Sequence, residues 1–148
     1  MAQSLSHVLV HIIFSTKHRE SMIREALRPR LFSYIAGTLR GINCPPLQVG
    51  GIGDHIHACL QLCRTKAIAN VLEEMKTASS KWMKAEGVAD FAWQAGYGVF
   101  SVSGSKAEEV VTYIKQQEDH HRRLSFQDEY RQFLMRHGIQ FDERYVWD

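Results

Sequence analysis

The chain has 148 residues, of which 45% are hydrophobic and 23% charged, and its formal net charge is only +2. These values are typical of one globular domain over residues 1–148, which is large enough to bury a core without metal or disulfide cross-links. Because the net charge is small, any basic surface must be local. The three cysteines form no Cys-x-x-Cys pair, which argues against a disulfide framework or a zinc ribbon. No apolar run reaches the ~20 residues of a membrane span, and no signal-peptide pattern is present, so we expect a cytoplasmic protein without membrane contact.

Alternating and helical hydrophobic patterns follow one another along the chain. The predicted elements are a strand over 7–16, a helix from 24–29 to 41, a short strand at 47–49, a strand over 54–62, a helix over 65–87, a strand over 97–102, a helix from 105 to about 117–120, and a helix over 125–138. Thr65 is expected to cap one helix, and the run that begins at Ser105 reads as a capping box for another. The aromatic tail is expected to dock on the domain.

This order predicts an α+β fold of the ferredoxin-like, split βαβ type (β-α-β-β-α-β), with an antiparallel sheet, a C-terminal helix and a tail. In that layout the first and third strands are adjacent at the centre, and both crossover helices cover one face. The other face is expected to be open. Its polar positions would be His7, His11, His55, His57 and Gln61.

His55 and His57 are two residues apart on a predicted strand, so both imidazoles point to the same side of the sheet. Two such nitrogen donors can share one metal ion, but histidines of a half-buried strand more often only bond to neighbours. The pair becomes a site only with a third ligand and a reactive group.

Tyr113 and Gln117 are four residues apart in the helix predicted from Ser105, so they lie on one side of it, with His120 further round. Alone, such a pair is usually a packing pair. Together with His55 and His57, Tyr113 and Gln117 form a set of two imidazoles, an amide oxygen and a phenol. A phenol with a pKa near ~10 is a weak nucleophile, and a divalent metal that binds the phosphate oxygens would help it to attack a phosphodiester.

At these residues the chain resembles the single-tyrosine HUH transposases of the smallest bacterial insertion sequences, the IS two hundred/IS six hundred and five type. The matching segments are 54–57, 76–82, 113–117, 125–130 and 142–147, in the family's order. Gly53 departs from the family, where many relatives carry proline.

The resemblance implies a DNA transposase that cuts and rejoins single-stranded DNA at hairpin-bearing element ends, through a 5′-phosphotyrosine. Tyr113 would be the nucleophile, and His55, His57 and Gln117 would bind Mg²⁺ or Mn²⁺. His11 and His120 are further candidates for the site. It also implies a bacterial or archaeal protein that works as a homodimer.

Local basic and hydroxyl side chains supply the expected DNA path. They are Lys17, Arg19, Lys76, Ser80 and Lys81. We also expect the active site to be shared in trans, because the short 103–105 turn should place the helix of Tyr113 on a partner more easily than under its own sheet.

Three alternative functions compete with this interpretation. A histidine-triad nucleotide hydrolase needs a third histidine where Cys59 stands. A non-catalytic RRM-like nucleic-acid-binding module needs exposed aromatics on the central strands, where histidine, cysteine and glutamine stand. A host-retained relative that acts on repeat elements would have the same chemistry, and the sequence does not separate it from a mobile-element enzyme.

Overall fold

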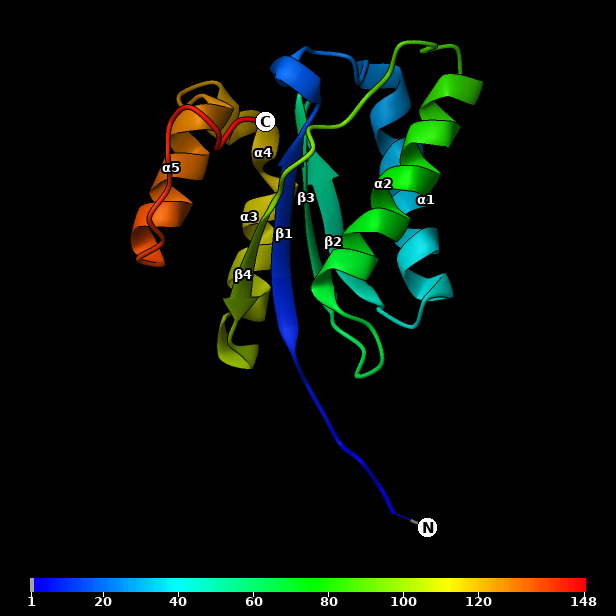
Figure 1. The fold of residues 1–148 in the computed structure, drawn as a ribbon, viewed down its shortest axis with the longest axis vertical. Coiled ribbons are helices and arrows are strands. Elements are labelled where there is room, and N and C mark those ends of the chain that lie inside the picture. Colours follow the sequence, from blue (N-terminus) through cyan, green and yellow to red (C-terminus); the bar gives the residue numbers. More distant parts are fainter. Residues whose placement is uncertain (1) are drawn as a thin grey trace.

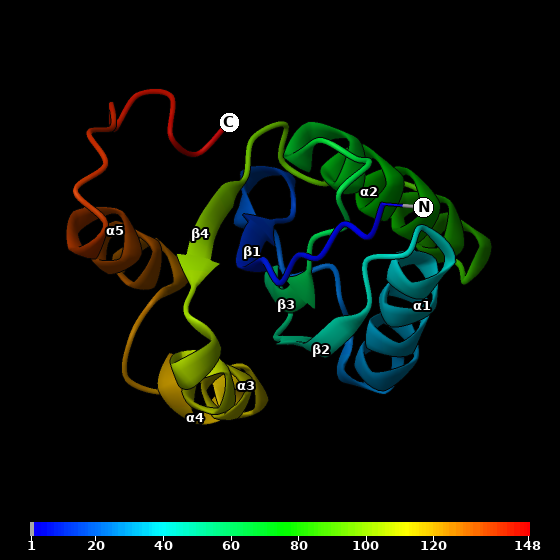
Figure 2. The same ribbon diagram turned by 90° about the horizontal axis from the view of Figure 1, so that it is seen from below.

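The computed structural model describes residues 2–148 as a four-stranded sheet with helices on both faces (Figures 1 and 2). The elements are β1 (Leu9–Ser15), the 3-10 turns η1 (Lys17–Arg19) and η2 (Glu25–Leu27), α1 (Arg28–Gly41), β2 (Pro46–Gly51), β3 (His55–Gln61), α2 (Ile68–Ala85), β4 (Gly98–Val102), η3 (Gly104–Lys106), α3 (Ala107–Lys115), α4 (Gln117–His121) and α5 (Phe126–Arg136). Within the described part of the chain, no helix has both the length and the apolar character needed to cross a bilayer.

The sheet has the strand order β2-β3-β1-β4, and all three strand pairs are antiparallel. β1 and β3 are therefore central, as the split βαβ prediction required. Their register places His11 opposite Cys59 and Ser15 opposite His55. The α+β fold class predicted from the sequence is confirmed.

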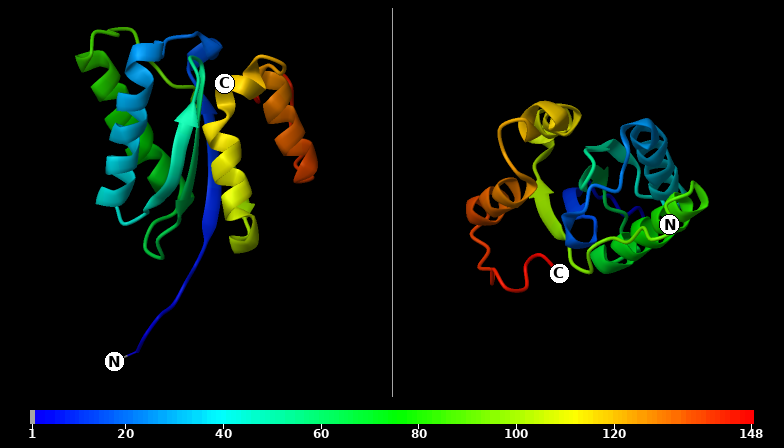
Figure 3. Two further views of the ribbon diagram at one scale, coloured as in Figure 1. Left: turned by 180° about the vertical axis from the view of Figure 1, so that it is seen from behind. Right: turned by 90° about the horizontal axis from the view of Figure 1, so that it is seen from above.

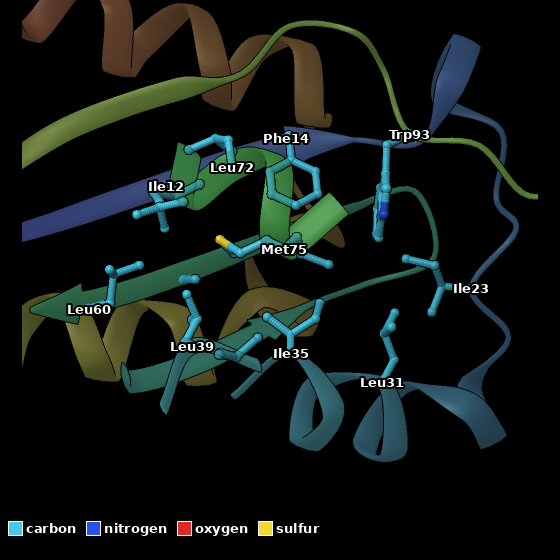
Figure 4. Packing of buried hydrophobic residues seen from close by; sticks show 14 of the residues in the cluster. Ile12, Phe14, Ile23, Leu31, Ile35, Leu39, Leu60, Leu72, Met75 and Trp93 are labelled. Atoms are coloured by element: carbon cyan, nitrogen blue, oxygen red, sulfur yellow. The ribbon is translucent and has the colours of Figure 1, made fainter. Parts of the chain in front are cut away.

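α1 and α2 pack side by side against one face of the sheet (Figure 3). The apolar positions of the central strands alternate with period two, so Ile12 and Phe14 face these helices together. Leu31 and Ile35 of α1 point at the same layer, and Met75 of α2 joins it (Figure 4). This layer is the main hydrophobic core, and it fills the space between the sheet and the two helices.

The opposite face of the sheet is covered, and the expectation of an open face is wrong. α3, α4 and α5 lie over it, as Figure 3 shows from behind and from above. A second apolar cluster joins α5 to the sheet. Its buried members are Ile13, Phe100, Phe126, Tyr130 and Leu134. The reason is that α5 is amphipathic and must bury its apolar stripe, and the second sheet face is the free surface next to it.

Two predicted helix starts are also wrong. α2 begins at Ile68 with Ala67 as its N-cap, so Thr65 does not cap it. Before α3, the Ser103 side chain accepts a hydrogen bond from the Ser105 N–H, and the helix proper begins at Ala107. In contrast, the Ser125 side chain caps α5 by accepting a hydrogen bond from the Asp128 N–H at 3.2 Å.

The tail docks on the domain, as its aromatic residues predicted. Trp147 lies against Phe126 and Tyr130, with ring centroids 6.5 and 5.9 Å away. The Asp148 carbonyl oxygen accepts hydrogen bonds from the Gly96 N–H at 2.8 Å and from Gln94 Nε2 at 3.2 Å. The tail thus ties α5 to the loop that precedes β4.

Candidate active site

His55 and His57 lie side by side on β3, and their ring centroids are 5.1 Å apart. Period-two alternation of the strand directs both side chains to the face covered by α3, α4 and α5. Both side chains are completely buried, with 0% of their surface exposed. The pair is therefore part of an enclosed polar cluster.

The Nδ1 atom of each histidine lies within hydrogen-bond distance of a neighbouring side chain. His55 Nδ1 is 2.7 Å from Asp54 Oδ1, and His57 Nδ1 is 2.8 Å from Nε2 of His11 on β1. Bonds of this kind fix the ring orientation of a metal-ligating histidine and leave its other nitrogen free to face the metal. His11, a candidate from the sequence, accordingly lies behind the cluster and orients His57.

α3 and α4 bring Tyr113 and Gln117 to the same cluster. Gln117 Oε1 lies 3.0 Å from His55 Nε2, so the expected association of Gln117 with the histidine pair is present. The helix breaks between the two residues, because Gln116 has φ −98° and ψ 21°. The single helix expected from Ser105 to 117–120 is therefore two short helices.

Two further side chains of the cluster, His121 and Glu129, are not among those predicted from the sequence patterns. His121 Nε2 is 3.0 Å from Gln117 Oε1 and 3.2 Å from Glu129 Oε1. His121 follows Gln117 by four residues, so the same helical spacing that selected Gln117 could have found it. Glu129 lies on α5, and no sequence pattern connects it to the histidines.

Four of these side chains fit a divalent metal ion. The ligand atoms of His55, His57, His121 and Glu129 all lie within 4.8 Å of one another. Three imidazoles and a carboxylate are suitable ligands for Mn²⁺ and for other first-row divalent metals, and Gln117 Oε1 adds a neutral oxygen. Together with the Asp54 and His11 contacts, this donor set supports a metal site.

Electrostatic coupling inside the cluster is strong. Burial by itself lowers the pKa of His55, but hydrogen bonds to Asp54 and Glu129 outweigh it and raise the pKa to about 9. Burial lowers the pKa of His57. Burial opposes ionisation of Glu129, yet the electrostatic interaction with His57 and hydrogen bonds from His121 and His55 hold its pKa well below the usual range. The Glu129 carboxylate is therefore ionised.

Tyr113 donates its phenolic hydrogen to Glu129 Oε2. Burial, and then the negative charge of Glu129, raise the pKa of Tyr113 above its ordinary value of 10.0, so the phenol stays protonated at neutral pH. The His120 ring packs on the Tyr113 ring at 4.5 Å. Among residues 2–148, His120 Nε2 is the buried side-chain nitrogen that has no hydrogen-bond partner.

The residues expected to contact DNA lie on two elements, the η1 turn and α2. Lys17 and Lys81 are exposed, and Ser80 is half-buried. The Arg19 guanidinium lies over the Trp147 ring at 5.6 Å.

Lys76 has a different environment from the one expected of a phosphate contact. Its ammonium donates to the carbonyl oxygens of Gln94, Ala95 and Gly96 at 2.8, 3.2 and 2.7 Å. An ammonium has three donors, and all are used by the loop before β4. The structure therefore gives Lys76 a role in holding this loop, and the phosphate contact expected of it stays a prediction.

The solved structures that share this fold include two that cover most of this chain. A candidate transposase from Deinococcus radiodurans has a TM-score of 0.62 at 19% identity, over 79% of this chain and 98% of that one. A REP-associated tyrosine transposase bound to a REP hairpin has a TM-score of 0.60 at 15% identity, over 82% of this chain and 74% of that one. A comparison with curated proteins gives no match.

The sequence itself matches a protein family over most of its length. The family described as "Transposase IS200 like" matches residues 4–117. This segment includes His55, His57, Tyr113 and Gln117, and it ends before His121 and Glu129. The chain belongs to the IS200-like transposase family.

Proposed function

We propose that this transposase cuts and rejoins single-stranded DNA through a 5′-phosphotyrosine formed on Tyr113, with the help of a divalent metal. One observation supports the proposal above the others. The phenol of Tyr113 and the amide of Gln117 converge with His55 and His57 in one buried polar cluster, although the two pairs lie more than 50 residues apart in sequence.

The proposed reaction is a transesterification at phosphorus. A bond forms between the Tyr113 phenolic oxygen and phosphorus, and the bond from phosphorus to the 3′-oxygen breaks. The phenolic proton is taken up, in the net reaction, by the departing 3′-oxygen, so a 3′-hydroxyl and a tyrosyl phosphate remain. Attack by a 3′-hydroxyl reverses the step and rejoins the strand. Tyr113 is suited to this role because the ester keeps the energy of the broken bond.

His55, His57 and Gln117 would hold the metal, and His121 and Glu129 lie close enough to complete the ligand set. A divalent ion bound there would polarise the phosphate and stabilise the leaving oxygen. The imidazole ligands favour Mn²⁺ over Mg²⁺, although Mg²⁺ can bind through retained waters.

Hairpin-bearing single-stranded DNA is the proposed substrate. The proposed contacts with the DNA backbone remain Lys17, Arg19, Ser80 and Lys81. Within residues 2–148, none of these four side chains is bonded to several main-chain carbonyl oxygens, whereas Lys76 is. The structural neighbour that binds a REP hairpin makes a hairpin oligonucleotide the first substrate to test. Action on mobile elements or on host repeats would involve the same residues.

We also propose a homodimer with sites shared between chains. In the single chain, the Tyr113 ring lies 5.8 Å from the ring of its own His57, so the short 103–105 turn also permits placement of the helix against its own sheet. An exchange of α3 and α4 between two chains would reproduce the same contacts across the dimer, as in domain swapping. Sharing in trans therefore stays a prediction, and so does the cytoplasmic location.

The decisive experiment incubates the protein with a single-stranded hairpin oligonucleotide and Mn²⁺, followed by a denaturing gel. A covalent protein–DNA adduct is expected with the wild type. Mass spectrometry should locate the phosphate on Tyr113. If no adduct forms with any hairpin substrate in Mn²⁺ or Mg²⁺, or if another residue holds the phosphate, the proposed function is wrong.

A further inference from the structure

The site contains a carboxylate from a helix that lies outside the family match. Glu129 belongs to α5, beyond the matched residues 4–117, and only 1% of it is exposed. Its neighbours on the buried side of α5 are apolar or aromatic. A buried charge in such a row is unfavourable unless it has several partners, so the contacts of Glu129 are the feature that needs an explanation.

The two oxygens of Glu129 face two different groups. Oε1 lies 3.0 Å from His57 Nε2 and 3.2 Å from His121 Nε2. Oε2 accepts hydrogen bonds from the Tyr113 hydroxyl and, at 3.2 Å, from Gln117 Nε2. One side chain therefore joins the nucleophile to the proposed metal centre.

The helix break at Gln116 makes this connection important. Tyr113 belongs to α3 and Gln117 to α4, so no continuous helix fixes the distance between the phenol and the amide. Oε2 of Glu129 contacts both side chains across the break. The carboxylate thus supplies a restraint that the helix itself does not provide.

α5 is held on both sides of Glu129. One turn earlier, Phe126 stacks on the His55 ring at 4.5 Å and 21°. One turn later, Phe133 packs edge-on against the rings of His11 at 5.1 Å and Tyr113 at 5.7 Å. These contacts position the Glu129 backbone relative to both the histidines and the tyrosine, which is what accurate placement of a reacting group requires.

We propose that Glu129 is a positioning residue of the strand-transfer reaction, which holds the Tyr113 hydroxyl and the Gln117 amide in place against the histidine cluster. This inference rests on the proposed function, because it assigns Glu129 a role in the reaction of Tyr113. α5 is then part of the active site, and residues 4–117 alone lack one of its functional side chains.

The test compares Glu129→Gln, Glu129→Asp and the control Asp128→Asn. Glutamine keeps the size of the side chain and removes the charge, and aspartate keeps the charge and shortens the side chain. Asp128 is the exposed neighbour on α5, so its substitution removes a carboxylate without touching the cluster. Circular dichroism and thermal unfolding check that each variant folds. If the glutamine variant does not fold, the aspartate variant supplies the answer.

The first measurement does not depend on activity. The protein is labelled with 3-fluorotyrosine, and the fluorine signal of Tyr113 is assigned by its loss in Tyr113→Phe. We expect Glu129→Gln and Glu129→Asp to shift this signal, and Asp128→Asn to leave it unchanged. An unshifted Tyr113 signal in both Glu129 variants overturns the inference, whether or not the wild type cleaves DNA.

The second measurement is the rate of adduct formation at saturating hairpin DNA and saturating Mn²⁺. We expect both Glu129 variants to be slower by about 100-fold, the loss typical of a misplaced reacting group, with the Kd for DNA unchanged. A wild-type rate in Glu129→Asp would mean that charge alone matters, and a wild-type rate in Glu129→Gln at saturating Mn²⁺ would mean that Glu129 is only a ligand. Either result overturns the inference. Absence of the adduct in the wild type would instead refute the proposed function.

Discussion

Replacement of Lys76 by methionine separates a structural role from a DNA-binding role. Methionine keeps most of the side-chain volume and removes the ammonium that donates to the carbonyl oxygens of Gln94, Ala95 and Gly96. The same ammonium lies over the Phe14 and Tyr97 rings at 5.1 and 5.5 Å. Because one charged group satisfies several carbonyls, its loss should weaken the whole loop before β4.

The expected loss of unfolding free energy follows from these contacts. A hydrogen bond to a charged group contributes about 1.5–3 kcal/mol, but the carbonyl oxygens of this partly exposed loop can recover water when Lys76 is removed. We therefore expect Lys76→Met to lower the free energy of unfolding by about 2–3 kcal/mol in total. For a chain of this length that corresponds to a fall in Tm of about 5–10 °C.

The assay combines thermal unfolding with DNA binding at several salt concentrations. Lys81→Met is the matched control, since Lys81 is an exposed lysine on the same helix. Lys81→Met should change stability by less than ~0.5 kcal/mol, and if Lys81 contacts a phosphate it should reduce the salt slope of DNA binding by about 1. A Lys76→Met variant that unfolds like the wild type and has the reduced salt slope would refute the structural role of Lys76.

Three further outcomes are expected. Tyr113→Phe should abolish the covalent adduct and leave Mn²⁺ binding, measured by calorimetry, within about twofold, because the phenol is not in the proposed ligand set; a surviving adduct would assign the nucleophile to another residue. A mixture of His57→Ala and Tyr113→Phe chains, each inactive alone, should regain cleavage if sites are shared in trans, and no recovery after demonstrated subunit exchange would place each site within one chain. Gly98→Ala should lower the free energy of unfolding by about 1–3 kcal/mol, because the new methyl group would lie 2.6 Å from a ring carbon of Tyr130. Gly37→Ala is the control, since the space around Gly37 is open. Equal unfolding curves for the two variants would contradict the packing of α5 on β4.

Local periodicity was sufficient to predict the sheet and half of the site. Alternation along β3 places His55 and His57 on one side whatever surrounds them, and helical spacing keeps Tyr113 and Gln117 on one side even across the break at Gln116. The order of strands and helices predicted the antiparallel sheet with β1 and β3 at its centre. The side-chain directions depend on residues that are close in sequence, and the strand order follows from the order of the elements along the chain, which is why the sequence determined both.

Only the tertiary structure decided how the second face of the sheet is used. The sequence showed that α5 is amphipathic, but it did not show which surface its apolar stripe covers. The packing of Phe126 and Phe133 against the histidine face buries the site and brings Glu129 to Tyr113. The role of Lys76 was likewise decided by the loop that folds back onto α2. Contacts of this kind join segments that are far apart in the chain and have no periodic signal, so they follow from packing alone.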